Sequence, residues 1–248
     1  MDLKEFFAEH PACALGFSGG ADSAYLLAAG LALGADIRPY YVRTAFQPAF
    51  ELADARRLCS ELGAELTLLE YDVLSVPEVR ANPRERCYFC KRAIFSLICE
   101  RAARDGYDTV LDGTNASDDL EDRPGWRAIR ELGVLSPLLM CGITKAVLRQ
   151  ESEKLGIFTA RKPAYACLAT RAPEGMELSP ELLGRVERAE EALSKLGYSD
   201  FRVRLTREGF ARLELPDALL ERAIGERGAI LAALGGDFAR VTLDLKGR

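Results

Sequence analysis

The sequence predicts an α/β protein in which helices cover a parallel sheet, followed by a smaller α/β domain. Three observations carry this prediction. Short apolar runs alternate with helical patterns over residues 12–155, as in sheets whose parallel strands are joined by helices. Prolines and glycines then interrupt residues 161–180, and a second set of alternating elements follows. We therefore place a first domain over residues 1–162 and a second over residues 163–248.

The elements follow in order. Strands are expected over residues 12–17, 37–42, 65–71 and 109–112, and helices over 23–33, 48–62, 87–104 and 144–155. In the second domain Ser179 and Pro180 supply an N-cap and a first helical position for a helix through Lys195. Two strands around the turn 207–209 come next, then one helix from Asp217 to about Leu234 and a last strand over 239–245.

Composition excludes several classes of protein. With 48% hydrophobic and 29% charged residues the chain is typical of soluble globular proteins, and no basic leader or long apolar run predicts export or a membrane span. We expect a cytoplasmic protein. A net charge of -5 argues against broad nucleic-acid binding. The single histidine, His10, precedes the first strand, which argues against Ser-His-Asp, Cys-His and His-ligated zinc chemistry.

The strongest motif lies between the first strand and the first long helix. Ser18, Gly19 and Gly20 form a turn, and Asp22 and Ser23 open the helix. Adjacent glycines let the backbone approach a ligand, and amides at a helix N-terminus favour an anion such as pyrophosphate. Asp22 is suited to a Mg²⁺ ion that balances the phosphates. The alternative is a plain strand-to-helix turn with a capping side chain.

The seven cysteines point to metal or catalytic use rather than to disulfides. Cys87 and Cys90 stand one turn apart at a helix start beside basic residues, a setting that lowers a thiol pKa. Cys167 lies in an electropositive, proline-bounded loop that also favours a thiolate. The alternative for all three is structural burial, which we expect of the remaining thiols: Cys13, Cys59, Cys99 and Cys141.

Two further segments are candidates for ligand binding. Gly113, Thr114 and Asn115 follow a predicted strand, and the carboxyl ends of parallel strands are where such sheets place ligands. We assign them to the nucleotide, with a merely solvated acidic loop as the alternative. Arg202 and Arg204 share one face of a strand. Together with Arg171 they are candidates to bind a substrate phosphate, although solvent-facing arginines are as compatible with the pattern.

The motif Ser18-Gly19-Gly20-Ala21-Asp22-Ser23 resembles the signature of the PP-loop ATP pyrophosphatases. The resemblance implies an adenine nucleotide α-hydrolase-like fold and the cleavage of ATP, which releases pyrophosphate and leaves AMP on the substrate. The family includes synthetases, tRNA thiolases and sulfur transferases, so the substrate has to be inferred from other motifs.

SGGADS, RCYFCK, DGTNASD, EDRPG and KPAYACLATR together resemble the LarE family of sulfur transferases, which help to make the nickel-pincer nucleotide of lactate racemase. This resemblance implies that a carboxylate of pyridinium-3,5-biscarboxylic acid mononucleotide is adenylated and converted to a thiocarboxylate. It also implies that Cys87, Cys90 and Cys167 hold a 4Fe-4S cluster, as in three-cysteine members, or that Cys167 surrenders its own sulfur. We expect a homo-oligomer whose partner is this small molecule, with no nucleic acid.

Other functions remain compatible with the turn. A tRNA thiolase also pairs it with cysteines, but the acidic charge and the lack of a recognisable RNA-binding appendage weigh against that function. An ammonia-using synthetase such as NAD synthetase would not need Cys167. A nucleotide-binding regulator without catalysis would release no pyrophosphate.

Overall fold

The computed structural model describes residues 1–119, 124–163 and 165–247. The chain divides into two compact units. Unit 1 comprises Met1–Val79 and Glu85–Tyr165, and unit 2 comprises Arg80–Arg84 and Ala166–Arg248. The polypeptide thus leaves unit 1 briefly before its longest helix and finally after Tyr165.

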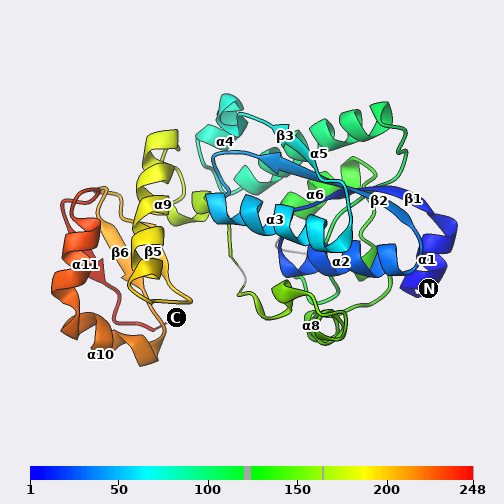
Figure 1. Cartoon of the computed structure of the whole chain (residues 1–248). Coiled ribbons are helices and arrows are strands. Elements are labelled where there is room, and N and C mark those ends of the chain that lie inside the picture. The colour runs from blue at the N-terminus through cyan, green and yellow to red at the C-terminus, as the bar shows by residue number, and fades with distance from the viewer. Residues whose placement is uncertain (120–123, 164, 248) are drawn as a thin grey trace. The chain divides into compact units, whose positions relative to one another are not determined.

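Four strands form the sheet of unit 1, in the order β3-β2-β1-β4, and Figure 1 labels β1, β2 and β3. Their bounds are Ala12–Gly16 (β1), Asp36–Arg43 (β2), Thr67–Glu70 (β3) and Val110–Leu111 (β4). Every pairing is parallel, which confirms the predicted parallel sheet. The chain moves outward from β1 through β2 to β3 and then returns to place β4 on the other side of β1. Ligands in open α/β sheets bind beyond the carboxyl ends of the strands at such a reversal.

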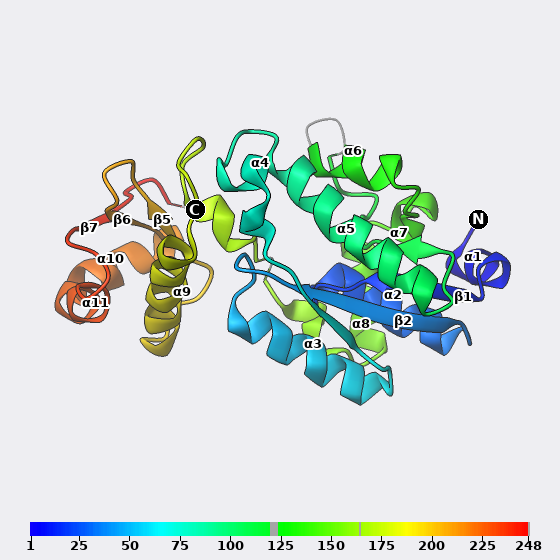
Figure 2. The same cartoon turned by 90° about the horizontal axis from the view of Figure 1, so that it is seen from above.

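Helices cover both faces of this sheet, as Figure 2 shows. One face carries α2 (Ala21–Ala32), α3 (Ala49–Leu62) and α8 (Lys145–Lys154), and the other carries α5 (Arg86–Arg104) and α6 (Pro124–Glu131). The shorter elements are α1 (Leu3–Glu9), η1 (Val73–Ser75), α4 (Pro77–Arg80), α7 (Pro137–Met140) and η2 (Phe158–Arg161). In the part of the chain that the structure describes, no helix has the length and apolar character needed to cross a bilayer.

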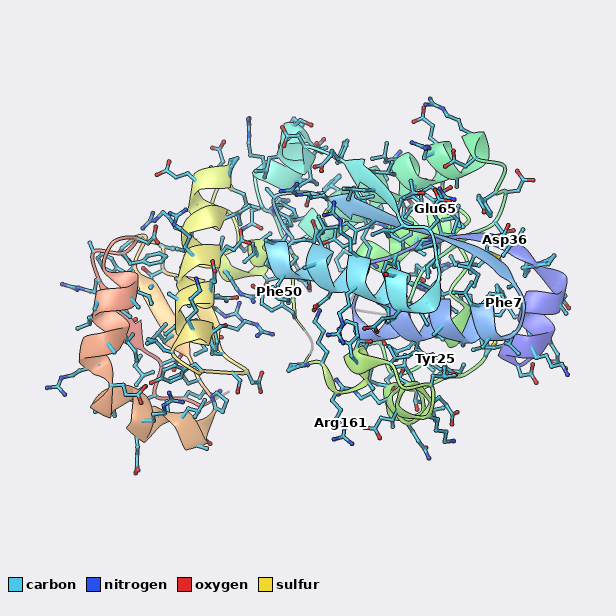
Figure 3. All side chains as sticks on the ribbon, viewed as in Figure 1. Phe7, Tyr25, Asp36, Phe50, Glu65 and Arg161 are labelled. Carbon is cyan, nitrogen blue, oxygen red and sulfur yellow. The ribbon has the colours of Figure 1, made fainter. Side chains whose placement is uncertain are left out.

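The strands are buried on both sides because their residues alternate between two apolar layers. In β1, Leu15 packs in a hydrophobic cluster with residues of α2 and α3. Ala14, on the opposite face, packs in a second cluster with residues of α5. Close packing on the first face depends on Gly30 of α2. A Cβ at that position would lie 2.1 Å from Ile37 Cδ1 and 2.8 Å from the ring of Phe7, which Figure 3 labels on α1. Glycine therefore sets how near α1 and β2 come to α2.

Unit 2 is a small α/β unit built on a three-stranded sheet of order β5-β6-β7. Strands β5 (Arg202–Leu205) and β6 (Ala211–Glu214) are antiparallel, and β7 (Val241–Leu243) is parallel to β6. Its helical elements are η3 (Leu168–Arg171), α9 (Pro180–Lys195), α10 (Asp217–Gly225) and α11 (Arg227–Leu234). As predicted, α9 begins at Pro180 and is capped by Ser179, whose side chain accepts a hydrogen bond from the Leu182 amide.

The prediction of one helix from Asp217 to about Leu234 is wrong. The helix is broken at Glu226, whose backbone leaves the helical region at φ -93° and ψ 15°. Gly225 and Gly228 flank the break, and glycine costs about 1 kcal/mol in a helix interior relative to alanine. The Glu226 carboxylate also accepts hydrogen bonds from Tyr198 Oη at 2.9 Å and Arg222 Nε at 3.0 Å, which hold the break in place.

Candidate active site

The turn between β1 and α2 is tightly shaped by its glycines. Gly19 has φ +70°, a conformation that favours glycine, and a Cβ there would lie 3.2 Å from Ala55 Cβ and 3.3 Å from the carbonyl oxygen of Glu51. Gly20 is the N-cap residue of α2 and has no side chain with which to occupy the first amides of the helix. The backbone therefore presents the N-terminus of α2 to an anion, supported from behind by α3.

Two serine hydroxyls brace this turn. Ser23 Oγ is buried, lies 3.2 Å from Ser18 Oγ and donates to the Gly20 carbonyl at 3.3 Å. Ser18 is exposed, and its Oγ accepts from the Gly20 amide. Ser23 thus shapes the turn from inside, while Ser18 faces solvent at its mouth.

Asp22 meets two residues that are distant in sequence. Its carboxylate accepts bonds from Lys145 Nζ at 2.7 and 2.6 Å, and Asn115 Nδ2 donates to Oδ1 at 3.1 Å. The Asp22 and Lys145 side chains are 30% and 31% exposed, so the pair lies at the surface of the site. Lys145, the first residue of α8, was not among the residues that the sequence predicted for this site. A lysine at the N-terminus of a helix is unfavourable because the helix dipole is positive there. This unfavourable position is the signal by which the sequence could have identified Lys145.

The segment after β4 reaches the same place. Gly113 rests on the start of α2, where a Cβ would lie 3.1 Å from the Ser23 amide nitrogen. Asp112 is buried and accepts from Thr114 Oγ1 at 2.5 Å and Ser136 Oγ at 2.6 Å, with Lys91 Nζ at 3.8 Å. This network fixes the strand end, so the structure brings the residues predicted at 113–115 against the turn. Their role in binding ATP stays a prediction.

The cysteines fall into two groups. Cys87 is exposed and Cys90 half-buried on the first turns of α5, and Arg86 Nη2 donates to Cys87 Sγ at 3.6 Å. Cys167 is half-buried and occupies the N-cap position of η3 of unit 2. Within the described residues no group of three or more potential metal-binding side chains is gathered in one place. A joint site of these three thiols stays a prediction, and Glu121, Asp122 and Arg123 of the EDRPG motif lie outside the described residues.

Burial raises the pKa of each of the other four thiols. Cys13 and Cys59 are buried, as predicted, and burial raises the pKa of each to about 11. Cys99 and Cys141 are half-buried, and burial raises the pKa of these thiols as well. All four are poor candidates for nucleophiles because the thiolate is the reactive form.

The predicted phosphate-binding arginines have partners inside unit 2. Arg171 is buried, with Nε 2.7 Å from Glu190 Oε1, and its Nη1 donates to the Ala166 carbonyl at 2.9 Å. It thereby holds the backbone next to Cys167. Arg202 is buried and donates to the Phe201 carbonyl, whereas Arg204 is half-buried and donates to the Thr170 carbonyl at 2.6 Å. Their role toward a substrate phosphate stays a prediction.

Comparison with known proteins supplies the family. No protein-family model matches the chain. It is 37% identical to an uncharacterized protein of Synechocystis sp. over 99% of this chain and 93% of the relative. An uncharacterized protein of Methanocaldococcus jannaschii is 31% identical over 99% of this chain and 93% of its own length. The pyridinium-3,5-bisthiocarboxylic acid mononucleotide synthase of Lactiplantibacillus plantarum is 32% identical over 93% of this chain and 84% of that enzyme. With that identity over nearly its whole length, and with the parallel sheet and glycine turn described above, the chain belongs to the family of pyridinium-3,5-bisthiocarboxylic acid mononucleotide synthases, the LarE family.

Proposed function

We propose that the chain, a member of an enzyme family, is an ATP-dependent sulfur transferase. It adenylates a carboxylate of pyridinium-3,5-biscarboxylic acid mononucleotide and converts it to a thiocarboxylate. The observation that carries the ATP-dependent step is the meeting of the glycine turn with Asp22, Asn115 and Lys145 beyond the carboxyl end of β1. The name of the relative from Lactiplantibacillus plantarum supports the choice of product.

Adenylation solves a chemical problem of the substrate. A carboxylate resists nucleophilic attack, so one of its oxygens first attacks the α-phosphorus of ATP. The bond between that phosphorus and the oxygen leading to the β-phosphate breaks, and pyrophosphate leaves with the electron pair. Mg²⁺ at Asp22 would neutralise phosphate charge, and the amides at the start of α2 would donate to the phosphate oxygens.

Sulfur transfer follows by one of two routes. In the first, the Cys167 thiolate displaces AMP to form a thioester, and loss of the Cys167 α-proton then breaks its Cβ–S bond. This leaves the thiocarboxylate on the substrate and dehydroalanine in the chain. In the second, Cys87, Cys90 and Cys167 would hold a 4Fe-4S cluster, which would supply the sulfide that displaces AMP from the adenylate. The exposed Cys87 and the half-buried Cys90 of α5, beside Arg86, are chemically suited to this donor set.

Replacing Asp22 tests the ATP-dependent step. We expect Asp22→Ala to abolish pyrophosphate release from ATP and the mononucleotide while the protein stays folded, because the carboxylate acts on Mg²⁺ and phosphate rather than on packing. Pyrophosphate is measured by a coupled assay and folding by thermal melting.

A matched control is Glu65→Ala. Like Asp22, Glu65 accepts hydrogen bonds through both carboxylate oxygens, here from the Arg38 guanidinium at 2.6 Å each. Unlike Asp22, it precedes β3 at the amino edge of the sheet (Figure 3). This variant should release pyrophosphate at the wild-type rate. Native-rate release by Asp22→Ala would show that the assigned role is wrong.

A further inference from the structure

Lys145 is held in position by its backbone as well as by its side chain. Its amide donates to Ser117 Oγ at 2.9 Å, and the Ala116 amide donates to the Ile143 carbonyl at 2.9 Å. Thr144 caps α8 by accepting from the Val147 amide. The loop after β4 therefore fixes where α8 begins, and α8 in turn packs beside α2. The same loop that carries Asn115 thus delivers an ammonium group to Asp22.

The charges around Asp22 suit Lys145 to bind a second partner. Both Asp22 and the N-terminus of α2 lie where the phosphates of ATP are proposed to bind. A polyphosphate beside a bare carboxylate is repelled, and Lys145 now neutralises that carboxylate through both oxygens. When Mg²⁺ takes the Asp22 oxygens, the ammonium loses this partner while remaining beside the phosphates. A half-buried lysine with a long flexible stem can then reach them.

We propose that Lys145 is a catalytic residue that exchanges partners: it neutralises Asp22 in the nucleotide-free chain and binds the departing pyrophosphate when ATP is present. This inference rests on the proposed function and adds to it a residue for the leaving group. No proton moves in this step. As the bond between the α-phosphorus and its bridging oxygen breaks, the ammonium balances the charge that develops on the pyrophosphate.

The test compares nucleotides with and without the leaving group. For Lys145→Met we expect Mg²⁺–ATP to bind about 10- to 100-fold more weakly, as loss of a charge-assisted hydrogen bond predicts. The affinity for AMP should change by less than about twofold, since AMP lacks both phosphates that Lys145 contacts. Titration calorimetry measures both affinities without turnover. In the pyrophosphate assay the variant should be at least about 100-fold slower.

The controls separate a contact with phosphate from a structural effect. Lys154→Met, at the other end of α8, removes an exposed lysine paired with Glu151 and should leave both affinities unchanged. Lys145→Arg keeps the charge and should retain a preference of the site for ATP over AMP. If Lys145→Met does not melt like the wild type, the arginine variant alone decides. A ratio of ATP to AMP affinity that equals the wild-type ratio, or lies between that ratio and one, supports the inference. A complete loss of the preference for ATP overturns it.

The outcomes distinguish this inference from the proposed function. Equal losses of ATP and AMP affinity, or no loss of either, in a folded Lys145→Met protein would overturn the role of Lys145. A wild-type protein that binds ATP but releases no pyrophosphate with the mononucleotide would instead refute the proposed function, and the affinity comparison would still decide the role of Lys145. A wild-type protein that binds neither nucleotide would refute both.

Discussion

The thiols of this chain differ in the environment that controls their reactivity. With the pKa raised to about 11, Cys13 and Cys59 would be about 0.1% thiolate at pH 8. Cys87 is exposed at the surface of α5. In iron-free protein at pH 8 we therefore expect iodoacetamide to modify Cys87 and to leave Cys13 and Cys59 unmodified. Peptide mass spectrometry identifies the labelled positions.

Unfolding supplies the control for this prediction. In guanidinium chloride the buried thiols lose their shielding, and Cys13 and Cys59 should be labelled as fast as Cys87. As pH rises from about 9 toward 11, the folded state loses stability because it keeps the thiol protons that the unfolded chain gives up. The buried thiols should become reactive over the same pH range. Labelling of native Cys13 or Cys59 at the rate of Cys87 at pH 8 would contradict their assignment.

At the scale of single residues, sequence pattern identified the groups that are neighbours along the chain. Ser18 to Ser23 could be assigned together because the turn needs its glycines and hydroxyls side by side. Lys145 could not, since its contact with Asp22 spans 123 residues and only the packing of α8 beside α2 creates it. Arg171 looked available in the sequence because a basic residue near Cys167 gives no sign that Glu190 will bury it.

At the scale of elements, β5 offers the next prediction. We expect substitution of both Arg202 and Arg204 by alanine to weaken binding of the mononucleotide by about 10-fold or more, as loss of charge-assisted hydrogen bonds implies, and to affect ATP less. Calorimetric titration with each ligand measures the difference. An equal loss of affinity for both ligands, or no loss of affinity for either, would contradict the assignment.

The neighbouring strand provides a matched control. Arg212 of β6 is exposed and pairs with Glu214 at 3.0 Å, the same carboxylate that Arg204 contacts. Arg212→Ala should leave both affinities unchanged. A melting curve for the double variant checks that loss of the buried Arg202 side chain has not unfolded unit 2.

The strands and the longer helices could be predicted because their apolar periodicity is local, whereas the short helices α1, α4, α6 and α7 and the break at Glu226 were not predicted. Helix α1 was not predicted, although its capping box between Asp2 and Glu5 is visible in the sequence, because a helix of seven residues is too short to show a clear apolar period. The break at Glu226 depends on Tyr198, a partner outside the helix. Local pattern therefore predicts where an element lies better than where a tertiary contact interrupts it.

At the scale of the whole molecule, the sulfur source remains the principal prediction. If Cys87, Cys90 and Cys167 hold a cluster, alanine at any one of them should lower iron content and sulfur transfer together, because two protein thiolates retain a cubane poorly. Iron and sulfide are measured in anaerobically purified protein. We favour this route because a single sacrificial cysteine gives no reason for the accessible pair on α5.

The sacrificial route makes a different prediction for the cysteines of α5. Cys167→Ala alone should stop transfer, Cys87→Ala should retain one turnover, and the reacted chain should lose the mass of one hydrogen sulfide. Iron-free protein that transfers sulfur once and acquires dehydroalanine at position 167 would overturn the cluster. Cys59→Ala, at a buried thiol away from the α5 pair, is the control and should retain iron and transfer.

The order of strands in unit 1 also has a consequence for how the chain acquires its site during synthesis. β1 is made first, yet one of its two neighbours is β4, and the contacts of Asp22 with Asn115 and Lys145 close loops of 93 and 123 residues. Such distant contacts are slow to form because the entropy of loop closure opposes them. A nascent chain therefore carries its glycine turn long before it carries the residues that meet it. The ATP that we propose to bind here would stabilise the finished unit by mass action, but it would give little help to the earlier folding intermediates.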